Sequence, residues 1–365
     1  MTGSTPRRSP RLIRGIAAAF AAGALTAGSI GPATAATVYN GYITPLGLAV
    51  EGSDVYVANA FAGFVTRNGG PFSGGTVLAA GQDAYASGVD VDGGEVVFTG
   101  AIGGPPGLYR VTANPAAPDL IADLATYEAT VNPDQDQVYG LTGISSSCLD
   151  KFEHKVPSLP ATYSGVVDSN PYAVTFDPDG GWFVADAAAN AILHVSETGA
   201  VSTVAVLPPV PQVLPKELRK ELRVPRIDGE PNPDRVKLPQ CVIGETYLAE
   251  PVPTDVEIGP GGMLYVSLLP GLTETGGKVV VVDPDNGNVV ATVASGLEAA
   301  VDTAVASDGT VYVAELNGNR VSVWSGGTKQ GEYPVPLPGA VEVDGGTVYV
   351  TTGALTDAGT VETLN

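Results

Sequence analysis

The segment Asn170–Asp186 reads NPYAVTFDPDGGWFVAD and is the clearest copy of a phrase that returns along the chain. Alternate residues from Tyr172 to Phe176 are large, which is the period of a β-strand. The next four residues, Asp177–Gly180, form a turn sequence, because Pro presets φ, Asp bonds its own backbone and Gly accepts positive φ. Trp182–Val184 then reads as the return strand, so the phrase predicts an antiparallel hairpin.

Two further strands follow this hairpin, at Ile192–Val195 and Ala200–Leu207, and four antiparallel strands in about 38 residues make one propeller blade. A lone blade cannot bury its two apolar faces, so neighbouring blades must stack around an axis. The phrase occurs six times in all, which predicts a six-bladed β-propeller. The other five copies lie at Pro45–Asn59, Ala86–Gly100, Val252–Leu268, Ala300–Glu315 and Pro338–Thr352.

The last copy has room for only one more strand, Thr360–Leu364, before the sequence stops. We therefore expect Thr37–Ile43 to supply the missing outer strand of the sixth blade. Such pairing closes the ring and protects an edge that would otherwise be free.

The first 35 residues have the pattern of a signal peptide. Four arginines come first, Ile16–Ile30 is apolar, and Ala33–Ala35 fits the small-residue cleavage rule. A membrane anchor is the alternative, but this apolar run is shorter than the roughly 20 residues needed to span a bilayer. We expect cleavage near Ala35, secretion, no membrane insertion, and a single propeller domain over residues 36–365.

Acidic residues dominate the rest of the chain. After the four leader arginines are set aside, 14 Lys and Arg remain against 39 Asp and Glu. Nucleic-acid binding needs Lys and Arg to displace counterions, so this charge argues against a nucleic-acid partner. It permits divalent cations and cationic partners, and solubility alone is the alternative explanation.

Two long connections interrupt the repeat, at residues 125–169 and 208–251. Both run from the outer strand of one blade to the inner strand of the next, so they emerge on the same face, and we expect them to touch and to cap it. Loops held by a rigid scaffold are where function concentrates.

Each connection carries one cysteine, Cys148 or Cys241, and in an exported protein we expect them to form a disulfide. Such a bridge is worth roughly 4–5 kcal/mol in chain entropy. A metal site or a reactive thiol would need companions, and the sequence offers only His154 and His194.

The second connection contains leucines four residues apart and many charges, which predicts a short amphipathic helix over Lys216–Arg223. Seven of the 14 remaining basic residues lie between Lys216 and Lys237. They form either a site for an anion or a partner, or a solvated helix seated on the acidic propeller.

Several phrases resemble the ScyD/ScyE family of exported β-propellers. The specific ones are DSNPY, residues 168–172, and PVPTD, residues 251–255, within a likeness that runs from about Pro45 to the end of the chain. The blades also resemble NHL-like and gluconolactonase-like propellers. These resemblances imply a six-bladed exported propeller, and for lactonases of that kind a cation at the channel mouth.

Polar residues at the starts of the inner strands are the candidate site. Carboxylate and amide oxygens that converge on a channel suit Ca²⁺, which takes six to eight oxygen ligands. The alternative is that Asp and Asn at these places only form turns. The candidate metal ligands are Asp168, Asn170, Asp255 and Asp302, and the candidate ligand-binding set adds Tyr172 and Thr254, with Asp90 close by.

Enzyme motifs are otherwise missing, including the nucleophile elbow, the zinc-protease helix and the phosphate-binding loop. We therefore expect an exported, non-catalytic binding or scaffold propeller for a small molecule, glycan or protein. The alternative is a divalent-cation-dependent, lactonase-like hydrolase or lyase that works at the channel mouth.

Overall fold

A computed structural model describes residues 36–364, except 83, 158, 220–234, 271, 273 and 274. The predicted signal peptide lies outside the described residues and stays a prediction. No described helix is long and apolar enough to cross a membrane.

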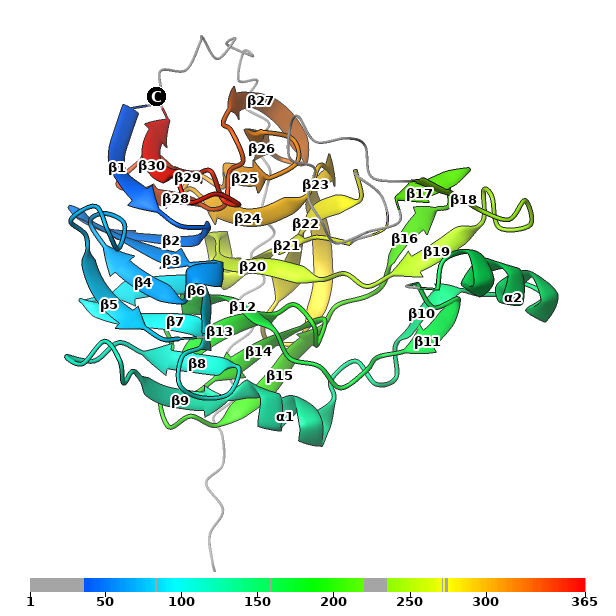
Figure 1. The fold of residues 1–365 in the computed structure, drawn as a ribbon, viewed down its shortest axis with the longest axis horizontal. Helices are drawn as coiled ribbons and strands as arrows, with labels where there is room; N and C mark the ends of the chain where they lie inside the picture. Colours follow the sequence, from blue (N-terminus) through cyan, green and yellow to red (C-terminus); the bar gives the residue numbers. More distant parts are fainter. Residues whose placement is uncertain are drawn as a thin grey trace, which may run out of the picture.

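Six four-stranded antiparallel sheets form the ring, as the repeat predicts (Figure 1). Blade 1 consists of β2 (Pro45–Glu51), β3 (Asp54–Asn59), β4 (Phe64–Arg67) and β5 (Thr76–Ala80). Blade 2 consists of β6 (Tyr85–Asp92), β7 (Glu95–Ala101), β8 (Gly107–Arg110) and β9 (Asp119–Asp123). Blade 3 consists of β12 (Pro171–Phe176), β13 (Trp182–Asp186), β14 (Ala191–Val195) and β15 (Val201–Val206).

The second half of the ring repeats the pattern. Blade 4 consists of β20 (Pro253–Ile258), β21 (Leu264–Leu268), β22 (Gly277–Asp283) and β23 (Asn288–Leu297). Blade 5 consists of β24 (Ala300–Val305), β25 (Val311–Glu315), β26 (Arg320–Ser325) and β27 (Thr328–Pro334). Blade 6 consists of β28 (Val341–Asp344), β29 (Thr347–Thr352), β30 (Gly359–Leu364) and β1 (Ala36–Tyr42). Two short 3₁₀ helices, η1 (Ala60–Ala62) and η2 (Pro260–Gly262), lie in turns.

The N-terminal strand completes the sixth blade, which confirms the expected closure. β1 runs antiparallel to β30, with Ala36 opposite Thr363 and Tyr42 opposite Gly359. The Tyr42 side chain is fully buried. Its hydroxyl accepts a hydrogen bond from the Gly69 N–H at 3.0 Å, which ties the end of β1 to blade 1.

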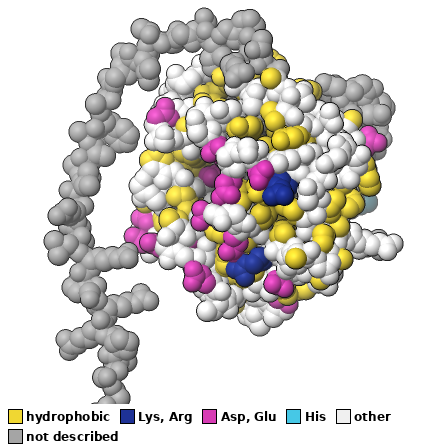
Figure 2. All heavy atoms as spheres, turned by 90° about the vertical axis from the view of Figure 1, so that its left-hand side faces the viewer, with side chains coloured by type: hydrophobic (Ala, Val, Ile, Leu, Met, Phe, Trp, Pro, Cys, Tyr) yellow, Lys and Arg dark blue, Asp and Glu magenta, His cyan; other side chains and the backbone are white. Residues whose placement is uncertain are grey.

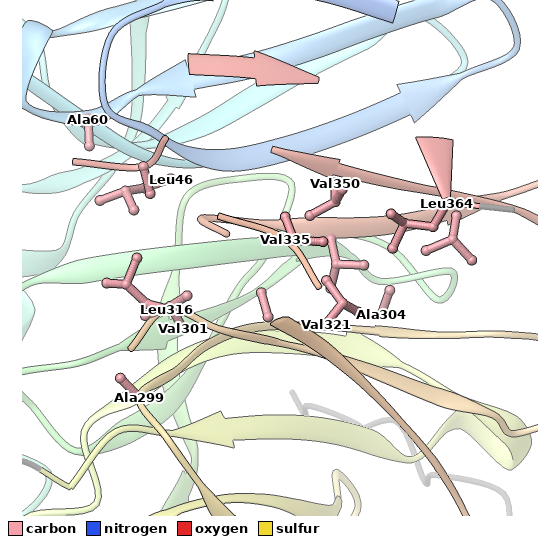
Figure 3. Packing of buried hydrophobic residues seen from close by; sticks show 14 residues of the cluster. Leu46, Ala60, Ala299, Val301, Ala304, Leu316, Val321, Val335, Val350 and Leu364 are labelled. Atoms are coloured by element: carbon pink, nitrogen blue, oxygen red, sulfur yellow. The ribbon is translucent and has the colours of Figure 1, made fainter. Parts of the chain in front are cut away.

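Apolar side chains fill the spaces between neighbouring blades. Val301, Leu316 and Val321 of blade 5 and its loops belong to one buried cluster with Val350 and Leu364 of blade 6 (Figure 3). Each sheet therefore buries both faces against its neighbours, which is the physical reason why a single blade would not fold alone.

The two connections assemble into one body, which we call the insertion unit. Its sheet has the order β11-β10-β19-β16, so two strands of the first connection lie beside two strands of the second, and β10 and β19 join the two pairs. The strands of this sheet are β10 (Val138–Leu141), β11 (Thr162–Ser164), β16 (Val210–Val213) and β19 (Thr246–Ala249). The second connection also forms a two-stranded sheet of β17 (Glu217–Arg219) and β18 (Arg235–Lys237). The first connection contains the helices α1 (Leu124–Val131) and α2 (Ser146–Lys155).

The insertion unit is anchored on the loops of one face. Gln212 Nε2 donates to the Pro270 carbonyl of the β21–β22 loop at 3.5 Å, and Leu272 of that loop packs in the core of the unit. The unit therefore stands beside blades 3 and 4 and projects from the ring, on the right in Figure 1.

The disulfide prediction is confirmed, because Cys148 of α2 bonds to Cys241 across 93 residues of sequence. The helix predicted over Lys216–Arg223 is wrong where the structure describes it. Glu217–Arg219 is a strand that pairs with Arg235–Lys237, and the remainder of the predicted helix lies outside the described residues. A spacing of four fits one face of a strand as well as one face of a helix, and both Leu214 and Leu218 are buried.

Acidic side chains are spread over the blades seen from the left of Figure 1, where they outnumber basic ones (Figure 2). The described arginines of the ring and Lys329 form ion pairs that neutralise part of this charge. Examples are Arg110 with Glu95 at 2.7 Å and Arg320 with Glu315 at 2.6 Å.

Candidate active site in the central channel

The inner strands of all six blades line a narrow central channel. Its free volume is about 20 Å³, which is enough for a single water molecule or ion. Among the described residues that line it there is no Lys, Arg or His. Five of the lining side chains are carboxyls: Asp90, Asp255, Glu257, Asp302 and Glu342.

Two of these carboxyls, Asp255 and Asp302, occupy equivalent places near the start of the inner strands of blades 4 and 5. Each follows a bulge and lies opposite the second strand, Asp255 opposite Ser267 and Asp302 opposite Ala314. In blades 1 and 3 the same place holds the small residues Gly47 and Ala173. The carboxyls are therefore gathered on one side of the channel mouth.

The other three carboxyls lie two residues further along the inner strands of alternate blades. Asp90 of blade 2 is opposite Val97, Glu257 of blade 4 is opposite Tyr265, and Glu342 of blade 6 is opposite Tyr349. Residues i and i+2 of a strand share a face, so these side chains form a second, deeper ring below the mouth.

Three of the five carboxyls also join neighbouring blades. Asp90 Oδ2 accepts a hydrogen bond from the Phe176 N–H at 2.9 Å, Asp255 Oδ2 from the Thr303 N–H at 3.0 Å, and Asp302 Oδ1 from the Val341 N–H at 2.9 Å. Each bond satisfies a backbone donor on the exposed edge of the next inner strand, where no further strand can pair.

Burial and mutual repulsion disfavour the charged form of these groups. Burial is the main cause that raises the pKa of Asp90 to about 6, of Asp255 to about 7 and of Glu342 to about 8. Burial also raises the pKa of Asp302 well above its usual range, and the charge of Asp255 adds to that effect. The pKa of Glu257 is raised in the same way, with Glu342 the largest charged contributor.

Four of the six predicted ligand-binding residues, Tyr172, Thr254, Asp255 and Asp302, do line the channel. Burial, with the charges of Asp302 and Asp255, raises the pKa of the Tyr172 phenol. Thr254 has a structural partner, because its hydroxyl donates to the Ala300 carbonyl of the next blade at 3.0 Å.

Asp168 and Asn170 are not among the residues that line the channel. They precede β12, where the Asn170 N–H donates to Asp186 Oδ1 at 2.8 Å and the Ser169 hydroxyl donates to Asp186 Oδ2 at 2.7 Å. Asp186 is fully buried, so this network fixes the turn that leads into blade 3. The turn-forming alternative therefore describes Asn170 better than a role at the channel, and Asp168 is outside the channel lining as well.

The four predicted calcium ligands are consequently not brought together. Across the described ranges, no three His, Cys, Asp or Glu residues are placed so that they could hold a metal ion. Asp255 and Asp302 each use one carboxyl oxygen for a backbone N–H, which leaves fewer oxygens than the six to eight that calcium takes. The donor set does not fit a resident calcium ion held by protein groups.

Glu257 and Glu342 were missed in the sequence. Their signal was available in the repeat, because VEI at 256–258 and VEV at 341–343 align with VDV at 89–91. The aligned acidic positions become meaningful only when the ring brings alternate blades to one axis.

Comparison with family models and with curated proteins found no match. Solved structures do match over most of the chain. A gluconolactonase from Xanthomonas campestris is 14% identical, with a TM-score of 0.53 over 92% of this chain and 91% of its own. Regucalcin from Agrobacterium tumefaciens, described as a calcium-binding protein, is 11% identical, with a TM-score of 0.51 over 91% and 95%. A Bacteroides thetaiotaomicron protein of unknown function is 13% identical, with a TM-score of 0.54 over 91% and 76%.

At these identities the likeness shows the β-propeller fold. It also corrects our expectation of a non-catalytic binding or scaffold propeller, because a match that covers more than nine-tenths of both chains is an enzyme, a gluconolactonase.

Proposed function

We propose that the protein is a hydrolase or lyase that acts at the channel mouth on a small neutral substrate of the lactone class. The observation that carries the proposal is the set of five channel carboxyls with raised pKa values and no basic residue among the described lining. Carboxyls that titrate near neutral pH suit proton transfer, and active sites are where such shifts concentrate.

The two mouth carboxyls have different assignments. Asp255, with a pKa of about 7, is partly ionised at neutral pH and is the candidate base. Asp302, whose pKa is raised well above its usual range by burial and by the charge of Asp255, is the candidate acid. Repulsion between two neighbouring buried carboxyls favours one ionised and one protonated member, which suits a base and an acid.

In lactone hydrolysis, Asp255 would take a proton from the attacking water while the new C–O bond forms at the ester carbon. The ring C–O bond then breaks, and Asp302 would give its proton to the departing alkoxide. In a lyase reaction, Asp255 would instead remove a proton next to a carbonyl, and Asp302 would protonate the leaving group. Both schemes use the same two carboxyls.

Charge supports a neutral substrate. A closed lactone has no charge and meets no repulsion at an acidic mouth, whereas the hydroxy-acid product is an anion and is repelled from it. The channel itself has room for about one water molecule, so the substrate would lie on the mouth and not within the channel.

The activity test is hydrolysis of gluconolactone and other lactones by the purified protein, followed by titration of released acid. Asp255→Asn should keep the acceptor for the Thr303 N–H yet lose most activity, since an amide cannot act as the base. The matched control is Asp308→Asn, because Asp308 caps only the exposed turn at Thr310. Equal activity of wild type and Asp255→Asn on every lactone hydrolysed would overturn the assignment.

We also propose that the activity depends on calcium, which is supported by the match to a regucalcin described as a calcium-binding protein. A thermal melt in EDTA and then in excess Ca²⁺ tests it, because a ligand of the native state stabilises that state. A rise of several degrees supports a cation whose remaining ligands are water molecules. No shift removes calcium from the proposal.

We also propose that the protein belongs to the ScyD/ScyE family and that it is secreted. Membership of the ScyD/ScyE family is supported by the DSNPY and PVPTD phrases, and secretion by the leader and the disulfide. Detection of the protein in the culture medium, with an N-terminus near Ala36, would support secretion.

A further inference from the structure

The insertion unit carries an open groove of about 430 Å³, away from the channel. One wall is α2, and the other is the segment that follows β18. The described lining residues are Asp150, Lys151, His154, Lys155, Lys237, Leu238 and Pro239.

The groove gathers cationic side chains that the rest of the unit does not neutralise. Lys151, Lys155 and Lys237 are exposed, and within the described part of the chain none of them forms an ion pair. In the ring, by contrast, Arg67 pairs with Asp54 and Lys329 with Glu332. Three unpaired lysines on a chain of net charge −21 are a local reversal of charge.

The floor of the groove is apolar and both walls are fixed. Leu238 is only 6% exposed and shares a buried cluster with Phe152 of α2. The Cys148–Cys241 bond joins α2 to the loop just beyond Pro239. The lysines therefore stand on a preformed surface, which lowers the entropic cost of binding.

We propose that this groove binds an acidic, amphipathic peptide segment of a partner protein. The lysines of both walls would receive carboxylates, while Leu238 and Pro239 would contact apolar side chains between them. The groove volume is in the range of ligand sites, about 300–1,000 Å³. A nucleic acid fits less well, because its dense charge would be repelled by the acidic ring, whereas an extended peptide spaces its carboxylates apart.

The test uses a fluorescein-labelled peptide of alternating Glu and Leu and fluorescence anisotropy with the full protein at 50 mM and 200 mM salt. We expect saturable binding that weakens with salt. The triple variant Lys151→Glu, Lys155→Glu and Lys237→Glu should weaken it at least tenfold. The charge-matched control is Arg67→Glu, Lys278→Glu and Lys329→Glu, which changes the net charge equally but leaves the groove intact.

Three outcomes would overturn the proposal. Equal loss in both triple variants would mean that only overall charge matters. Equal binding of a Gln and Leu peptide would mean an apolar surface without charge selection. Full competition by inorganic phosphate at the concentration of the peptide would indicate a small-anion site.

The groove variant could be replaced if circular dichroism shows that it does not fold. The single variants Lys151→Gln and Lys155→Gln would then be measured instead, and each should weaken peptide binding about threefold. The channel carboxyls are untouched in every variant, so failure here leaves the lactone proposal standing.

Discussion

The ring and the insertion unit differ in how the order of their strands in the sheet relates to the order in the chain. Each of blades 1 to 5 of the ring is a run of four strands that pair in the order in which they occur in the chain. In the insertion unit, β10 pairs with β19, more than 100 residues further along the sequence. A repeat encodes the first arrangement locally, whereas the second exists only after blade 3 has brought its two neighbouring connections together.

The two regions also treat charge differently. The ring buries carboxyls at its axis and pairs its described arginines, while the insertion unit leaves lysines in the open. Under our two proposals, the ring supplies proton chemistry and the insertion unit supplies an electrostatic docking surface. Four experiments test this contrast, and the one with the greatest effect comes first.

Loss of β1 should damage the ring most. Deletion of Ala36–Tyr42, compared with a chain that begins at Ala36, exposes the edge of β30 and removes the buried Tyr42. We expect the melting temperature to fall by about 5–10 °C, since the loss of several kcal/mol shifts a domain of this size by roughly 1.5 °C for each kcal/mol. Calorimetry checks this, and an unchanged melt would mean that blade 6 is stable with three strands.

The disulfide should matter to the insertion unit and little to the ring. The double variant Cys148→Ser and Cys241→Ser should lose about 4 kcal/mol locally, because the bridge closes a long loop. Hydrogen exchange should accelerate in α2 and β18 while the channel strands keep their protection. If every blade loses protection to the same extent, the two regions unfold as one cooperative unit and the contrast fails.

Close packing between blades gives a third prediction. A Cβ added at Gly88 would lie 2.6 Å from the Ala173 Cα and 2.8 Å from the Tyr172 carbonyl oxygen of the next blade. Gly88→Ala should therefore cost about 1–3 kcal/mol by overpacking. The control is Gly52→Ala, in a turn with nothing near the added carbon, which should cost less despite its positive φ. Urea denaturation compares the two, and equal costs would show that the blades can separate slightly at the axis.

The channel carboxyls should make ring stability fall as the pH rises. Their pKa values are raised in the folded protein, so the fold is penalised once they ionise. Stability is then complete below about pH 4, the unfolded range, and is lost as the pH passes through about 6 for Asp90, 7 for Asp255 and 8 for Glu342.

Glu342→Gln tests this most simply. It should raise the melting temperature by about 3 °C at pH 8.5 and by much less at pH 5, because it removes one of these ionisations. Glu197→Gln, in an exposed turn, serves as the control and should change neither value. Stability that instead rises with pH between 5 and 8 would contradict the crowding of carboxyls at the axis.

Much of the ring could be predicted from the residues. Alternation and turn residues in Asn170–Asp186 suffice for one hairpin, and six copies with a missing last strand led to closure by the N-terminal segment. The site could be predicted only in part. Asp255 and Asp302 were found, but Asp168 and Asn170 were assigned to the channel although Asp186 holds Asn170 in a turn. The strand at Glu217–Arg219 was assigned to a helix, because its partner β18 cannot be seen in a local pattern.

Features that depend on near neighbours could be predicted from the residues alone: the strand period, the turns, the number of blades, the acidic balance and the availability of two cysteines. The three-dimensional fold brings distant groups together. It placed Asp90, Glu257 and Glu342 from alternate blades around one axis, where burial raises their pKa values, and it joined two unrelated connections into a sheet with a lysine-lined groove. Hydrogen bonding and side-chain alternation act over a few residues, whereas desolvation and Coulomb repulsion depend on positions in space that no local pattern contains.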